Sequence, residues 1–111
     1  GVRFIVTVSP VRHLRDTLEL NQVSKATLRL ACHHICRQYA QVEYFPAYEI
    51  LMDDLRDYRF YEPDMIHPNR VAIDYIWKKF TDRYFDTHTR SLIDKIASIR
   101  QAMEHRPFHP T

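Results

Sequence analysis

The feature that most constrains the fold is a strand–helix–strand pattern in the first half of the chain. Residues 2–8 (VRFIVTV) form a β-branched, nearly continuous apolar run, which is typical of a buried strand in a parallel sheet. A helical period follows near 21–40, and residues 44–51 (YFPAYEIL) are typical of a second strand. A long helix between two strands predicts a right-handed βαβ unit with parallel strands near 3–8 and 44–51. The predicted fold class is α/β, with two parallel strands and flanking helices.

Three helices are predicted around these strands, near 21–40, 69–85 and 89–105, with a short helical turn and loop over 53–61. Asn21 or Ser24 could cap the first helix, and Asn69 could cap the second. Each helix has an apolar face. These faces comprise Leu28, Ala31, Cys32, Ile35 and Tyr39 in the first helix, Val71, Ile73, Ile76, Trp77 and Phe80 in the second, and Leu92, Ile96, Ile99 and Met103 in the third.

Length and charge limit the classes of protein to consider. A chain of 111 residues with 45% hydrophobic residues is one globular domain or part of one. Its net charge of +2 is small and evenly distributed, so no nucleic-acid partner is predicted. No apolar run approaches the roughly 20 residues that span a bilayer, so no membrane partner is predicted.

Glycine is nearly absent. The one glycine is Gly1, whereas an average composition of about 7% glycine predicts roughly eight. Without glycine there is no phosphate-binding loop, no dinucleotide fingerprint and no nucleophile elbow. No cofactor is therefore predicted, and the chain is expected to be a piece of a domain whose glycine-rich part lies elsewhere.

The segment Cys32-His33-His34-Ile35-Cys36 contains four potential metal ligands. A closed zinc site needs four ligands in a tetrahedral arrangement, and no second CxxC or HxxxH motif accompanies this helical segment. Two cysteines four residues apart on one helix also do not indicate a structural disulfide. No metal site is predicted, and a reducing compartment, the cytoplasm, is the expected location.

The candidate catalytic residues are Asp64 and His67, in the sequence Asp64-Met65-Ile66-His67-Pro68. Pro68 disfavours the α conformation at His67, which places this histidine on a loop before the second helix. The Asp64 carboxylate can then hold the His67 ring, as in the acid–histidine part of a hydrolytic triad. The alternative is that Asp64 caps the helix and His67 has no chemical role.

The loop after the first strand is a candidate substrate loop, with Ser9, Arg12 and His13 as its proposed residues. Parallel strands end at the same edge of a sheet, so this loop and the segment leading to His67 are expected to converge there. A solvated loop is the alternative. Neither Ser9 nor any other serine lies in a glycine-flanked elbow, and the nucleophile is therefore expected to precede residue 1.

Several motifs together resemble the GSCFA domain family, a branch of the SGNH (GDSL-like) hydrolases, over roughly residues 2–86. The similarity includes the Asp64–His67-Pro68 loop. The other motifs are Thr7-Val8-Ser9-Pro10-Val11-Arg12-His13, Asn21-Gln22-Val23-Ser24-Lys25-Ala26-Thr27-Leu28, Tyr44-Phe45-Pro46-Ala47-Tyr48-Glu49-Ile50 and Asp54-Leu55-Arg56-Asp57-Tyr58-Arg59-Phe60-Tyr61.

The resemblance implies that residues 1–111 are the C-terminal part of a single flavodoxin-like α/β/α sandwich. It assigns Asp64 as the orienting acid and His67 as the general base of a Ser(or Cys)-His-Asp triad. The motif that names the family and the glycine and asparagine oxyanion blocks have no counterpart in this chain. The implied activity is hydrolysis of a small-molecule or carbohydrate ester by the parent protein, and the isolated chain is expected to be inactive.

Two other functions remain open. The chain could be a non-catalytic binding or assembly module that grips a partner with the loop 56–61, or an acyltransferase that uses the same Asp64–His67 pair. Because a two-stranded sheet leaves strand edges open, we also expect the chain to self-associate or to pair with a missing N-terminal half.

Overall fold

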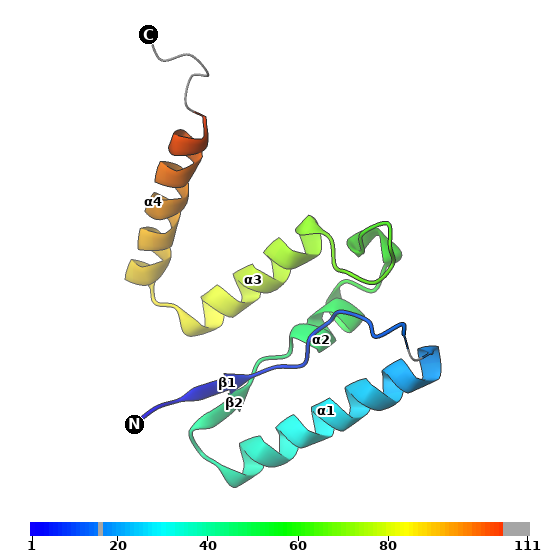
Figure 1. Ribbon diagram of the computed structural model, residues 1–111. Coiled ribbons are helices and arrows are strands. Elements are labelled where there is room, and N and C mark those ends of the chain that lie inside the picture. Colours follow the sequence, from blue (N-terminus) through cyan, green and yellow to red (C-terminus); the bar gives the residue numbers. More distant parts are fainter. Residues whose placement is uncertain (16, 106–111) are drawn as a thin grey trace. The chain divides into compact units, whose positions relative to one another are not determined.

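The computed structural model describes residues 1–15 and 17–105, which fall into two compact units, Gly1–Trp77 and Lys78–Thr111. The first unit contains the strands and most of the helices, and the second contains the end of α3 and all of α4 (Figure 1). The elements are β1 (Phe4–Val6), α1 (Leu18–Gln38), β2 (Val42–Tyr44), α2 (Ala47–Glu49), a π-helical segment (Ile50–Asp54), a 3-10 turn (Tyr58–Phe60), α3 (Arg70–Tyr84) and α4 (Thr87–Glu104).

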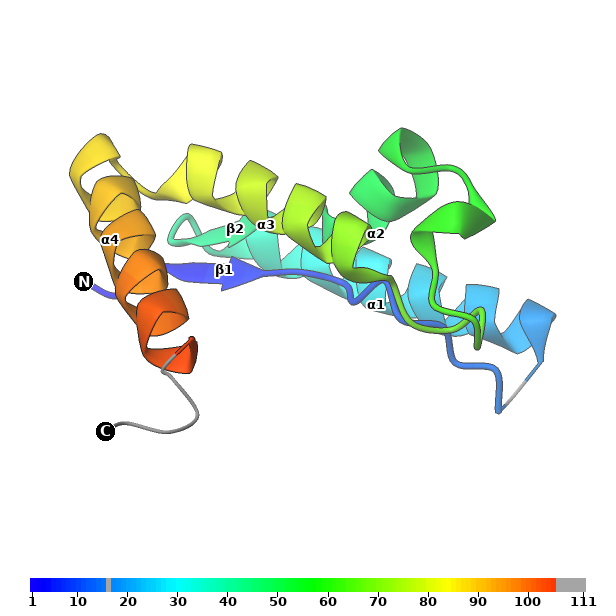
Figure 2. The same cartoon turned by 90° about the horizontal axis from the view of Figure 1, so that it is seen from above.

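The two strands of the first unit are parallel, as predicted. Phe4 lies opposite Val42 and Val6 lies opposite Tyr44. Figures 1 and 2 show α1 beside the strand pair and running in the opposite direction, which completes the βαβ unit. The chain is therefore α/β, with two parallel strands and flanking helices.

The second strand begins earlier than predicted and is much shorter. The prediction of a strand over 44–51 is wrong beyond Tyr44, because the chain turns into α2 and the π-helical segment. Pro46 has no N–H to donate to a strand neighbour, and its carbonyl instead accepts a hydrogen bond from Ile50 N at 2.9 Å. This bond closes the first helical turn after the sheet.

The apolar strand β1 is exposed, so the prediction of a buried strand is wrong for the described residues. Phe4 and Ile5 are 51% and 42% exposed. One edge of β1 pairs with β2, and within residues 1–15 and 17–105 no further strand pairs with the other edge. That another strand or another copy covers this edge stays a prediction.

Helix α1 buries a polar face. Asn21 and Lys25 are 6% and 2% exposed, whereas Leu28, Ile35 and Tyr39 from the predicted apolar face are each more than 40% exposed. The apolar face was predicted wrongly because polar contacts turn the other side of α1 toward the loop after β1. Asn21 accepts a hydrogen bond from His13 N, and Lys25 donates one to the carbonyl of Ser9.

The start of α1 also differs from the prediction. Its N-cap is Thr17, whose Oγ1 accepts a hydrogen bond from Leu20 N at 3.2 Å. The prediction of Asn21 or Ser24 as the cap is therefore wrong. Asn21 lies inside the helix, and its side chain accepts a hydrogen bond from His13 N at 2.7 Å. The boundaries of α3 and α4 agree with the predicted helices within two residues.

A small apolar core lies where the π-helical segment meets α3. Leu51, Leu55 and Ala72 are buried, and Phe60, Tyr61 and Ile76 pack against them. Ala72 has no exposed surface at all, so this small side chain lets α3 approach closely. The core therefore fixes the start of α3, immediately after the loop that contains the candidate catalytic pair.

In the second unit, Asp86 caps α4 by accepting a hydrogen bond from Thr89 N at 2.7 Å. Asp82 binds Arg90 at 2.9 Å, and the Phe80 and Tyr84 rings are in contact. Among the helices described for this chain, none is both long enough and apolar enough to cross a membrane.

Candidate catalytic loop

The segment 62–68 is a closed loop between the 3-10 turn and α3. Glu62 N donates a hydrogen bond to the carbonyl of His67 at 2.7 Å, and Tyr61 and Pro68 form an isolated antiparallel bridge. Asn69 ends the loop and caps α3, since its Oδ1 accepts from Ala72 N at 3.0 Å. The predicted position of His67 on a loop, with Asn69 as the cap, is confirmed.

The loop contains one residue in the left-handed region, Met65, with φ of 63°. This conformation costs a non-glycine residue about 1–2 kcal/mol. The turn is held by the Asp64 carboxylate, whose Oδ1 accepts hydrogen bonds from the backbone N–H groups of Ile66 at 2.8 Å and His67 at 3.0 Å. Asp64 therefore stabilises the strained backbone that separates it from His67.

The other oxygen of Asp64 contacts the His67 ring, with 2.6 Å between Oδ2 and Nδ1. A carboxylate accepts only, so the geometry assigns the ring proton to Nδ1 and leaves Nε2 with a lone pair. Nε2 has no hydrogen-bond partner among the described residues, and the His67 side chain is 59% exposed. Nδ1 of the ring is therefore held by Asp64, whereas Nε2 is free to accept a proton.

The hydrogen bonds to Asp64 also set its charge. Donation from the His67 ring, and then from the N–H groups of His67 and Ile66, lowers the pKa of Asp64 from 3.8 to about 2. The carboxylate is therefore ionised throughout the physiological range and can stabilise a positive charge on the imidazole.

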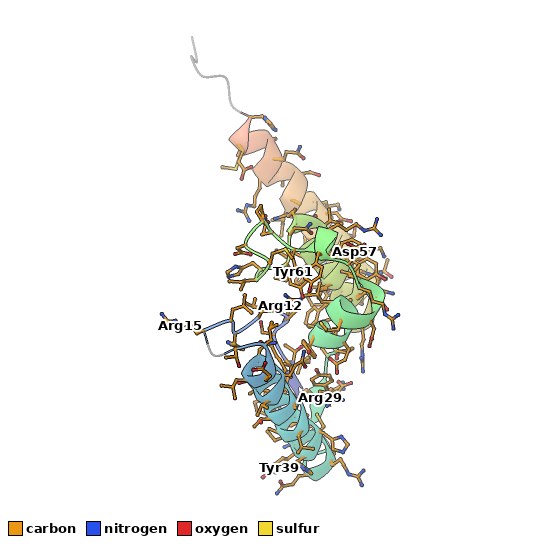
Figure 3. The ribbon with its side chains drawn as sticks, turned by 90° about the vertical axis from the view of Figure 1, so that its right-hand side faces the viewer. Arg12, Arg15, Arg29, Tyr39, Asp57 and Tyr61 are labelled. Atoms are coloured by element: carbon orange, nitrogen blue, oxygen red, sulfur yellow. The ribbon has the colours of Figure 1, made fainter. Side chains whose placement is uncertain are left out.

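The loop after β1 reaches this site through Arg12. Its backbone N donates to the carbonyl of Ile66 at 3.3 Å, and its Nη1 donates to the carbonyl of Met65 at 3.4 Å. The guanidinium lies over the rings of Tyr61 and Tyr58, 4.7 and 5.1 Å from their centroids. Figure 3 shows Arg12 beside Tyr61, with Arg15 turned away. The predicted convergence of the two loops is present.

The other two residues of the proposed substrate loop have different contacts. Ser9 Oγ accepts a hydrogen bond from Val11 N at 3.2 Å, within its own turn. His13 is exposed, and its backbone N donates to the side chain of Asn21 at 2.7 Å. Neither side chain is hydrogen-bonded to His67 in the part of the chain that the structure describes, so only Arg12 links this loop to the pair.

The sequence interpretation missed Lys25. Its ammonium donates a hydrogen bond to the carbonyl of Ser9 and lies 5.7 Å from the centroid of the Tyr48 ring. Burial lowers the pKa of Lys25. The spacing of Asn21 and Lys25, one helical turn apart, was the available signal, because it places two polar residues on the same side of α1.

Cys32 and Cys36 are both free thiols. Among the residues described, no three histidine, cysteine, aspartate or glutamate side chains are placed to hold a metal ion. The candidate site itself contains an imidazole oriented by Asp64 and an arginine bonded to the same loop.

No curated protein and no solved structure matches the chain. The family model described as the GSCFA family matches residues 1–80, which include β1, Lys25 and the whole of the loop 62–68. Since the match spans more than two thirds of its residues, the chain belongs to the GSCFA family.

Proposed function

We propose that this chain is part of an SGNH-type ester hydrolase and that Asp64 and His67 supply the acid–histidine part of a Ser(or Cys)-His-Asp triad. The observation that supports this proposal is the 2.6 Å contact between Asp64 Oδ2 and His67 Nδ1 in a ring whose Nε2 is open. A general base in acyl transfer needs this arrangement, since one ring nitrogen is fixed while the other accepts the proton.

In the proposed reaction, His67 Nε2 takes the proton of the nucleophile as its oxygen or sulfur attacks the ester carbonyl. The Asp64 carboxylate stabilises the imidazolium that forms. When the tetrahedral intermediate collapses, Nε2 gives this proton to the leaving alcohol, and an acyl-enzyme remains. Water then enters, gives a proton to Nε2 and releases the acid, with the nucleophile regaining the proton.

The proposal places the nucleophile and its oxyanion donors in sequence that precedes residue 1. It is consistent with the described residues, in which no serine or cysteine is hydrogen-bonded to His67. The isolated 111 residues should then be inactive. The proposed substrate is a carboxylic ester such as the O-acetyl group of a carbohydrate, and the free thiols Cys32 and Cys36 fit a reducing compartment such as the cytoplasm.

The test uses the intact protein, including the sequence that its gene encodes on either side of these residues. Hydrolysis of 4-nitrophenyl acetate is followed by absorbance for the natural protein, for His67→Ala and for His88→Ala. His88 is an exposed histidine in the first turn of α4 and serves as the matched control. His67→Ala should lower kcat by on the order of 10⁴- to 10⁶-fold, and His88→Ala should not.

Ester hydrolysis that survives in His67→Ala would show that His67 is not the general base. Product that forms only when an alcohol acceptor is added would replace the hydrolase proposal by a transferase. An intact protein that turns over no ester under either condition would support the binding-module alternative.

A further inference from the structure

A pocket of about 250 Å³ lies in the first unit, between the loop after β1, the start of α1 and the segments around the 3-10 turn. Arg12 and Tyr61, which Figure 3 places side by side, both line it. The pocket is smaller than the 300–1,000 Å³ typical of a complete ligand site, so its volume suits one group of a substrate. Its polar and aromatic lining includes Arg12, Asn21, Gln22, Lys25, Tyr48 and Tyr61.

Lys25 is the most unusual residue of this lining. It is 2% exposed, yet among the described residues no carboxylate forms an ion pair with it. An ammonium carries three N–H donors, and the carbonyl of Ser9 accepts one of them. Charged side chains are seldom buried without an opposite charge, because removing a cation from water is unfavourable. An anion in the pocket would supply that charge and accept the remaining donors.

Arg12 is the second cation of the pocket. Its guanidinium has five N–H donors. The carbonyl of Met65 accepts one at 3.4 Å, and side-chain hydrogen bonds to Tyr58 and Tyr61 use others and raise the pKa of Arg12. In the described part of the chain Arg12, like Lys25, makes no ion pair with a carboxylate. Its position over Tyr58 and Tyr61 holds the planar guanidinium in place. Two cations from different elements therefore line the same pocket without an acidic partner.

We propose that this pocket is an anion subsite, in which Lys25 and Arg12 bind a carboxylate, phosphate or sulfate group carried by the ester substrate. The subsite adjoins the catalytic loop, because Arg12 is hydrogen-bonded to the carbonyls of Met65 and Ile66, which lie between Asp64 and His67. An anionic group held by Arg12 would place the substrate next to the loop that carries His67. The substrate class rests on the proposed function, whereas anion binding does not.

The first test measures binding without turnover. Isothermal titration calorimetry with inorganic phosphate, sulfate and succinate is performed on the intact His67→Ala protein and on the same protein with Lys25→Met added. Methionine keeps most of the buried volume and removes the charge. At least one of the three anions should bind, and Lys25→Met should weaken it by about 10- to 100-fold, the usual effect of losing a hydrogen bond to a charged group.

The second test measures preference in the active protein. The matched pairs are 4-nitrophenyl acetate with 4-nitrophenyl succinate, and phenyl acetate with 4-carboxyphenyl acetate, which place the charge on the acyl or the alcohol side. In at least one pair, the ratio of kcat/KM for the anionic ester to that for the neutral ester should fall about 10- to 100-fold in Lys25→Met. Lys95→Met, which alters an exposed lysine of α4, should leave the ratio unchanged.

Arg12→Gln provides a second variant if Lys25→Met does not fold, because Arg12 is only partly buried and its backbone hydrogen bond to Ile66 does not depend on the side chain. It should weaken binding of the same anion. An active esterase that binds none of the three anions would overturn the subsite while the proposed function stands. Anion binding of equal strength with and without Lys25 would also overturn it. If the intact protein has no esterase activity but binds an anion that Lys25→Met no longer binds, the subsite stands and the proposed function is wrong.

Discussion

Substitution of Asp64 by asparagine separates the two tasks of this carboxylate. Oδ1 accepts from the N–H groups of Ile66 and His67 and holds the turn, whereas Oδ2 contacts His67 Nδ1 at 2.6 Å. In Asp64→Asn the amide oxygen can keep both backbone hydrogen bonds. The amide nitrogen then occupies the place of Oδ2 and presents a donor to the ring. The loop should stay closed while the contact to the ring is reversed.

The expected loss of activity follows from the position of the ring proton. With a donor opposite Nδ1, the neutral ring of His67 should carry its proton on Nε2, the atom that must accept the proton of the nucleophile. In serine proteases with a Ser-His-Asp triad, replacing the aspartate by asparagine lowers kcat about 10⁴-fold for this reason. We expect a decrease of the same order here, with little change in stability, because both backbone hydrogen bonds remain and the contact to the ring is reversed and not lost.

Two measurements on the intact protein check this prediction. The kcat for 4-nitrophenyl acetate gives the functional effect, and the ¹⁵N chemical shifts of the His67 ring show which nitrogen carries the proton. Asp57→Asn is the matched control: Asp57 accepts a hydrogen bond from Arg59 N at 2.9 Å in a similar turn of the same unit, and among the described residues it makes no hydrogen bond with His67. It removes the same charge and should leave both readouts unchanged.

The reasoning would be refuted by either of two results in Asp64→Asn. A kcat within tenfold of the natural protein would mean that the contact between Asp64 and the ring does not direct catalysis. A proton that remains on Nδ1 would mean that the ring is oriented by some other contact.

Three further predictions concern the loop and the core. Because the folded pKa of Asp64, about 2, lies below 3.8, the folded state binds fewer protons between these values. The resulting stability is present well above pH 3.8 and lost as pH falls through about 2. The Asp64 carboxyl ¹³C shift should titrate near 2, and a midpoint of 3.8 would mean that the pair does not form. Asn69→Ala should lower the free energy of unfolding by about 1–2 kcal/mol in urea, since Asn69 caps α3 and also donates to the carbonyl of Arg59. Asn69→Ser keeps an oxygen that can cap α3 and should cost less, and equal costs would contradict the capping role. Ala72→Leu should cost about 1–3 kcal/mol because Ala72 has no exposed surface, whereas Ala97→Leu on the exposed side of α4 should change stability by less than about 0.5 kcal/mol; similar effects at both positions would contradict the close approach of α3.

The predictable parts of the fold were those set by local chemistry. Pro68 disfavours a helical His67, and Asn69 then begins α3, so the catalytic loop could be placed from neighbouring residues alone. The second strand could not be placed because aromatic and apolar residues after Tyr44 suit a strand or a buried helix equally well. In the structure the strand ends where Pro46 supplies no N–H, and a long-range contact supports this turn, since Thr7 Oγ1 donates to the carbonyl of Phe45.

The role of Lys25 could not be predicted from its helix. A lysine on an amphipathic helix normally points to water, and the acceptor that draws Lys25 inward, the carbonyl of Ser9, is 16 residues away in sequence. The same holds for Arg12, whose acceptor on Met65 is 53 residues away. Long polar side chains that reach across loops produce no periodic pattern.

In this chain, which has one glycine, the loops near the candidate site are shaped by hydrogen bonds from other side chains. Glycine usually allows tight turns through its backbone freedom, but here Met65 takes the left-handed conformation and Asp64 holds it with two hydrogen bonds. Arg12 donates to the carbonyl of Met65, and Lys25 donates to the loop that carries Arg12. Lys25 thus holds the loop of Arg12, and Arg12 holds the turn between Asp64 and His67, so in our proposal the side chains that shape these loops without glycine also bind the charged group of the substrate.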